Sequence, residues 1–306
     1  MTIIHENIIL IFINMNSIQH NDPELENLLI ILAEHPDEKE NLIPRILKKL
    51  PWGCHPILYI EKIKDPQNRI LIRDSITFEL QIEKIKDDLV HLLPEYKSPD
   101  FLLKASFLMS YLSGEDPAVY DEFEEFLNTL SSDFKERLDL MRESSEAVKI
   151  KAYLNYFFNE LNFHGSQDTA GNIDHHNIQK VVNSKEGSAI ILCILANRIA
   201  AGAGINLPIV ITAGHFLLRT NIENEIPFID PFENGKIISE KEHMYNVASK
   251  GYDPSIGLLH ITSPLILLQR LLRNIAQSMN RLPNQNVNPQ IKELQEIIKS
   301  FIKDNP

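Results

Sequence analysis

The chain has 306 residues, 43% of them hydrophobic, and its 42 acidic residues outnumber 30 basic ones to give a formal net charge of −12. This length suits about two domains of ordinary size with hydrophobic cores of their own. The negative charge repels phosphate backbones and anionic lipid surfaces, so nucleic acid and membranes are excluded as expected partners.

The cysteine content is low. Cys54 and Cys193 are too few for a disulfide framework or a four-cysteine zinc site, which predicts a cytoplasmic protein. The apolar patch at residues 8–13 is too short to span a bilayer and lacks a cleavage signal. We therefore expect residues 1–21 to be disordered, with Met15 as an alternative start.

Residues 22–97 carry apolar side chains three and four positions apart, which predicts short helices. Asp22 followed by Pro23 is typical of a helix start, and further prolines divide the segment into blocks of one or two helices. The blocks suggest stacked HEAT-like helical hairpins. Residues 70–78 are rich enough in β-branched side chains that a strand remains an alternative there.

Pro99 disfavours helix at the residue before it, so we place a domain boundary between residues 97 and 98. A second helical block follows, and its predicted helices cover residues 101–112, 121–130, 134–141 and 147–163.

A further helix begins near Ser188, and predicted strands follow it at residues 208–212, 215–219, 226–230 and 236–238. Helices that precede a small antiparallel sheet give an α+β fold class. We expect this second domain to end at residue 245. Residues 246–306 would form a C-terminal helical extension, with helices at 265–279 and 289–302 pairing as an αα-hairpin.

One order of residues points to chemistry: a small-residue helix start, then a histidine on a strand, then an aspartate on the next strand. Papain-like hydrolases and transglutaminases arrange a nucleophile, a base and an orienting acid in this way. Six runs lie at residues 156–165, 187–192, 204–205, 214–217, 229–235 and 268–274. In these runs the chain resembles the transglutaminase-like proteins of the SirB type.

The resemblance implies a transglutaminase-like domain and, in many relatives, a continuation into tetratricopeptide-like helices. It gives His215 the histidine position and Asp230 the acid position of the triad. Their separation of fifteen positions leaves room for two strands and a hairpin. The nucleophile position falls on Ala189, which has no attacking atom.

Two residues near Ala189 could replace the missing thiol. Cys193 lies one helical turn further along, inside an apolar helix, where burial raises a thiol's pKa and leaves it inert. Ser188 lies at the helix start, where a hydroxyl usually caps backbone N–H groups. His215 beside Asp230 could equally be a structural ion pair.

A metal site is a further alternative, because His164, Asp168, Asp174, His175 and His176 lie in one polar segment. Adjacent histidines point apart in an extended chain, however, and no fixed ligand spacing appears. We therefore expect neither a metal nor another cofactor.

These observations lead to three hypotheses of function. In the first, a non-catalytic transglutaminase-like protein recognises a protein or peptide, or serves as a regulatory scaffold, with His215 donating a hydrogen bond. In the second, an amide hydrolase or transferase uses Ser188 or Cys193 with His215 and Asp230. In the third, the histidine and the aspartate only stabilise the sheet.

Overall fold

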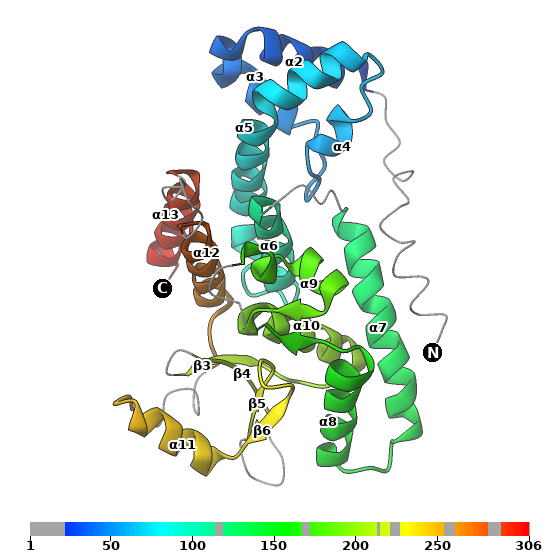
Figure 1. Ribbon diagram of the computed structural model, residues 1–306, viewed down its shortest axis with the longest axis vertical. Helices are drawn as coiled ribbons and strands as arrows, with labels where there is room; N and C mark the ends of the chain where they lie inside the picture. Colours follow the sequence, from blue (N-terminus) through cyan, green and yellow to red (C-terminus); the bar gives the residue numbers. More distant parts are fainter. Residues whose placement is uncertain are drawn as a thin grey trace.

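The computed structural model describes seven stretches of the chain, at residues 22–113, 119–166, 172–212, 215–220, 227–253, 261–280 and 289–305. The segment expected to be disordered lies outside these residues. Most of the described chain is helical, and one antiparallel sheet completes an α+β fold (Figure 1). None of the described helices combines the length and the apolar character needed to cross a bilayer.

The N-terminal block contains five helical elements before a final turn: α2 (Pro23–Glu34), η1 (Pro36–Glu38), α3 (Lys39–Leu47), α4 (Ile57–Ile60) and α5 (Pro66–Leu92), followed by η2 (Leu93–Glu95). Two of the helices have an aspartate cap directly before a first-turn proline. Asp22 accepts from two N–H groups of α2, and Asp65 does the same for α5. Residues 70–78 lie inside α5, so the helical interpretation of that segment is correct.

Helix α5 runs from the N-terminal helices into the main body (Figure 1) and contributes to two cores. Its first half packs with α2 and α3 around Leu29, Ile46 and Ile72. From Ile82 onward it belongs to the main core instead. The predicted boundary between residues 97 and 98 and the helical-repeat character of the block both stay predictions.

The middle of the chain wraps helices around one central helix. These elements are α6 (Phe101–Ser110), η3 (Tyr111–Ser113), α7 (Tyr120–Leu140), α8 (Glu146–Leu154), the π-helical η4 (Asn155–Glu160), β1 (His164–Gly165), η5 (Ile173–His176), α9 (Ile178–Ser184), β2 (Glu186–Gly187) and α10 (Ala189–Ala203). Helix α10 is apolar on nearly every side, which suits a helix surrounded by others. It ends at Gly204, whose φ of 92° allows the N–H of Ile205 to bond the carbonyl of Ala200.

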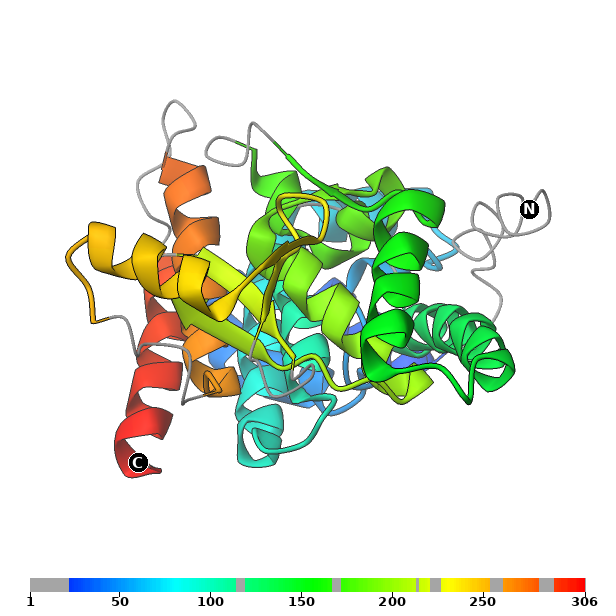
Figure 2. The same cartoon turned by 90° about the horizontal axis from the view of Figure 1, so that it is seen from below.

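Four strands form the sheet in the order β3 (Ile209–Thr212), β4 (His215–Arg219), β5 (Phe228–Asp230) and β6 (Lys236–Ile238), with all neighbours antiparallel. Helix α11 (Glu240–Ser249) follows β6 and crosses the predicted boundary at residue 245. Helices α12 (Pro264–Asn280) and α13 (Pro289–Asp304) close the chain and both contribute to the main core. They lie on one side of the body, with α7 and α8 on the other (Figure 1, Figure 2).

Candidate functional site

The two faces of the sheet belong to different cores. Side chains alternate along a strand, so Ile209, Leu218 and Ile229 point to one face, where they join the main core around α10. The opposite face carries a separate small cluster of Val210, Leu217, Phe228 and Ile238. The sheet is thus layered between α10 on one face and α11 on the other, as Figure 1 shows.

His215 and Asp230 lie on the α11 face. His215 is two positions from Leu217 in β4, and Asp230 is two positions from Phe228 in β5, so each points to the same face as its apolar neighbour. The pairing of Leu218 with Ile229 continues to place Asp230 opposite Leu217, which makes His215 its diagonal neighbour. His215 is exposed, whereas Asp230 is buried.

The carboxylate of Asp230 organises the turn that follows its strand. Its Oδ1 atom accepts hydrogen bonds from the backbone N–H groups of Phe232, at 2.9 Å, and Glu233, at 3.3 Å. Burial raises the pKa of Asp230, while these two N–H groups and the nearby His215 act in the opposite direction. Asp230 is therefore a turn-forming residue whatever else it does.

His215 has a cationic partner. The Nζ atom of Lys250, at the C-terminal end of α11, lies 2.8 Å from Nε2 of the imidazole. An ammonium group can only donate, so Nε2 accepts and the ring is neutral with its proton on Nδ1. In this arrangement the lone pair of Nε2 is not free to accept a proton from another group.

An open pocket of about 400 Å³ separates the sheet from α11. Its lining comes from the α11 face of the four strands, from the turn after β5 and from the inner side of α11: Thr212, His215, Leu217, Asp230, Glu233, Lys236, Ile238, His243, Asn246, Val247, Ser249 and Lys250. Helix α11 is anchored by two buried side chains, His243 and Val247. The imidazole of His243 stacks on the ring of Phe228 with centroids 4.0 Å apart.

The candidate nucleophiles do not line this pocket. Ala189 is the first residue of α10, and Ser188 is its N-cap without a side-chain capping bond. The hydroxyl of Ser188 instead lies 3.0 Å from Nδ1 of His176, and both residues are buried. The structure thus pairs Ser188 with a different histidine from the one that the sequence suggested.

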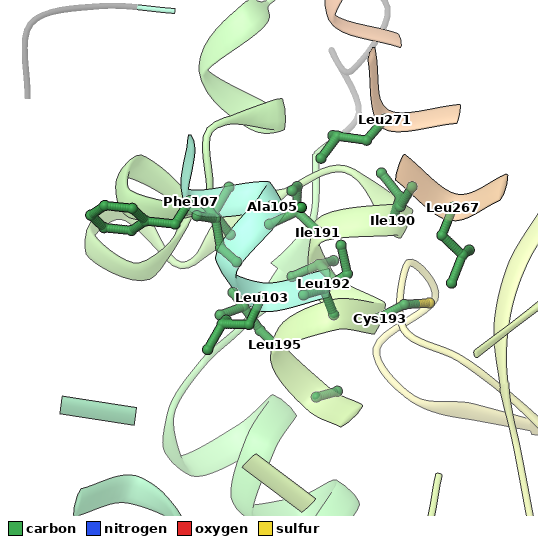
Figure 3. Packing of buried hydrophobic residues seen from close by; sticks show 14 of the residues in the cluster. Leu103, Ala105, Phe107, Ile190, Ile191, Leu192, Cys193, Leu195, Leu267 and Leu271 are labelled. Atoms are coloured by element: carbon green, nitrogen blue, oxygen red, sulfur yellow. The ribbon is translucent and has the colours of Figure 1, made fainter. Parts of the chain in front are cut away.

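Cys193 belongs to the core. Figure 3 shows it among buried side chains of α6, α10 and α12, including Leu103 and Leu267. Burial raises the pKa of this thiol well above its usual value, and the charge of Asp230 adds to the effect. The other cysteine, Cys54, is also buried.

The described residues of the polar segment considered for a metal do not converge on one site. Asp168 lies outside the described residues. Asp174 pairs with Lys180 at 2.8 Å, and His175 lies 4.0 Å from Glu186. Among the residues that the structure describes, no group of three potential ligands could hold a metal ion.

The sequence analysis missed one functional candidate and one contact. Lys250 follows a helix that was not predicted. His176 was considered only as a metal ligand, but it meets Ser188 through η5, twelve positions away in the chain. No sequence spacing signals either contact, because both depend on tertiary packing.

Comparison with known proteins identifies a transglutaminase-like domain in the chain. The model of the transglutaminase-like superfamily matches residues 121–273, which is half of the chain. A UPF0162 protein of Xylella fastidiosa (strain 9a5c) is 27% identical over 139 residues, covering 42% of this chain and 48% of that protein. A UPF0162 protein of strain Temecula1 / ATCC 700964 is 28% identical over 95 residues, covering 31% of this chain and 34% of that protein.

The chain therefore spans about half the length, at most, of the curated relatives it matches. No solved structure matches it.

Proposed function

The chain belongs to the transglutaminase-like superfamily, and from this premise we propose that its pocket binds a short peptide without cleaving or transferring it. The finer resemblance to SirB-type proteins is part of this proposal, as is the role of His215 and Asp230 as remnants of a triad. The peptide would come from a protein partner in the cytoplasm.

The observation that carries the proposal is the contact between Lys250 and His215 at 2.8 Å. A general base needs a free nitrogen lone pair directed at its nucleophile. Here the lone pair of Nε2 accepts from an ammonium group, and neither cysteine of the chain lines the pocket. A histidine held in this way is suited to hydrogen bonding rather than proton transfer.

The shape of the pocket supports a peptide ligand. Its volume of about 400 Å³ falls in the range of roughly 300–1,000 Å³ that small-ligand sites occupy. Leu217, Ile238 and Val247 give it a buried apolar lining beside its polar and charged groups. Strand β6 lies at the edge of the sheet, where an extended peptide could add its own backbone hydrogen bonds.

A blocked pocket tests the proposal. Ser249 is exposed and lines the pocket, whereas its exposed neighbour Ala248 does not. Binding of fluorescent pentapeptides should weaken at least about tenfold in Ser249→Trp, a loss of about 1.4 kcal/mol, and remain unchanged in Ala248→Trp. Turnover of any bound peptide, abolished by His215→Ala, would overturn the non-catalytic claim.

A second candidate function rests on the contact between Ser188 and His176. A serine at the start of a helix beside an imidazole has the parts of a nucleophile and its base for an amide hydrolase or transferase. Ser188 is only 4% exposed, so substrate access would require the loop before α10 to open. A fluorophosphonate probe would label Ser188 in this case, and His176→Gln would abolish the labelling.

A further inference from the structure

Four charged side chains line the pocket: Asp230, Glu233, Lys236 and Lys250. Two of them are satisfied within the protein. Asp230 accepts from the two N–H groups of its own turn, and Lys236 pairs with Glu242 at 3.4 Å. These two groups therefore have partners within the protein.

The other two charges are not neutralised. Lys250 contacts the neutral imidazole of His215, and within the described part of the chain it has no carboxylate in ion-pair distance. Glu233 likewise has no cationic partner among the described residues. In a protein with a net charge of −12, a lysine directed at an imidazole rather than at a carboxylate is available for an anionic group from outside.

The two uncompensated charges have opposite signs and share one pocket. We propose that the pocket binds a short peptide with a basic residue at its carboxyl terminus, the terminal carboxylate on Lys250 and His215 and the basic side chain on Glu233. This assignment rests on the proposed function and names its ligand class. The aliphatic part of the basic side chain would lie on Leu217 and Val247.

Charge complementarity excludes the simpler ligands. A ligand that bears only carboxylates is repelled by Glu233 and by the net negative charge of the protein. A ligand with cations alone leaves Lys250 facing a like charge and gives it no partner. A peptide end that bears both charges satisfies both groups without a net electrostatic cost.

The donor geometry at Lys250 favours a carboxylate. Its ammonium group has three N–H donors, and His215 uses one of them. Because Nε2 accepts, the second ring nitrogen of His215 carries a proton and adds a donor. A carboxylate has two oxygens with which to accept these bonds.

A set of four pentapeptides tests the assignment by calorimetry. Their last residue is lysine or norleucine, and their carboxyl terminus is free or amidated. Amidation and the exchange of lysine for norleucine should each weaken binding about tenfold, the usual effect of losing one charge-assisted hydrogen bond. Lys250→Met should lower the affinity for the free-terminus peptides about tenfold. It should leave the affinity for the amidated peptides unchanged, because these peptides have no terminal carboxylate for Lys250 to bind.

The matching experiment uses Glu233→Gln. This variant should bind the lysine peptides more weakly and the norleucine peptides with unchanged affinity. Lys241→Met and Glu143→Gln are the controls, since both residues are exposed and lie outside the pocket lining. Equal loss for free and amidated peptides in Lys250→Met, or equal affinity for all four peptides, would overturn the charge assignment and leave peptide binding standing. Failure of every peptide to bind the wild-type protein would overturn the proposed function as well.

Discussion

A Cβ atom added to Gly165 would lie 2.5 Å from the carbonyl oxygen of Phe232. The turn after β5 therefore packs directly against the β1–β2 pair, in which Gly165 lies opposite Gly187. Gly187 in turn precedes Ser188 and the start of α10. This contact fixes the turn formed by Asp230, and with it one wall of the pocket, relative to the central helix.

We expect Gly165→Ala to destabilise the protein by about 1–3 kcal/mol, the usual cost of overpacking a close contact. Denaturant unfolding followed by circular dichroism would measure the loss. The added methyl group meets both the backbone and the ring of Phe232. The double variant Gly165→Ala/Phe232→Ala should therefore remain less stable than Phe232→Ala alone, and full recovery would show that the backbone contact has no importance.

The Asp230 carboxylate should matter more as an acceptor than as a charge. Burial raises its pKa, so the ionised form carries a desolvation cost in the folded protein at neutral pH. Asp230→Asn keeps an oxygen for the N–H groups of Phe232 and Glu233 and should be nearly neutral in stability. Asp230→Ala leaves those donors without their acceptor and should cost about 1–2 kcal/mol. Equal stability of the two variants in urea titrations would contradict the turn-forming role.

The strands of the sheet could be predicted from the sequence more accurately than helix α11, which covers the pocket. Strands β4 and β6 have the predicted limits, since their apolar runs are bounded by clear turns. Helices α12 and α13 also appear within one or two residues of prediction. Helix α11 was missed because its buried stripe consists of His243 and Val247 alone, which is too sparse for a periodic signal.

Long-range packing accounts for the remaining differences. The predicted helices at residues 121–130 and 134–141 are one continuous helix, α7, because Ser131 bonds its hydroxyl to the carbonyl of Leu127 within the helix instead of ending it. The partners of His215 and Ser188 could not be read from spacing either. Each contact joins elements whose relative position only the folded core defines.

Both cysteines should resist alkylation in the folded protein. Cys193 is fully buried, and burial raises the pKa of both thiols, that of Cys54 to about 11. Iodoacetamide at neutral pH should modify neither within hours, as mass spectrometry would record, and both in denaturant. A native-state reaction at Cys193 that disappears in His215→Ala would instead support the cysteine-based enzyme.

His176 should make the protein sensitive to mild acid. Burial lowers the pKa of this imidazole from its usual 6.5 to about 4. Between these pH values the unfolded chain binds the proton and the folded protein does not, so stability falls as the pH decreases through this window. The full loss is about 3 kcal/mol for a shift of this size.

His176→Gln should therefore flatten the dependence of unfolding free energy on pH between about 6.5 and 4. Part of the pH dependence should remain in this variant, because burial also lowers the pKa of His55 to about 4. The exposed His91 provides the control, because His91→Gln removes a solvated imidazole. An unchanged pH profile in His176→Gln would show that this histidine titrates in the folded protein as it does in solvent.

The buried ion pair between Lys84 and Asp88 should be the most sensitive point of α5. Both side chains are almost completely buried, and Asp88 also accepts a 3.0 Å hydrogen bond from the N–H of Gly53. Lys84→Met leaves that carboxylate buried without its cation and should cost about 3–5 kcal/mol. Adding Asp88→Asn removes the uncompensated charge and keeps an acceptor for Gly53, so the double variant should recover most of the loss in chemical unfolding. The exposed Lys48→Met should change little, and a double variant no more stable than Lys84→Met would indicate that packing, rather than charge, explains the effect.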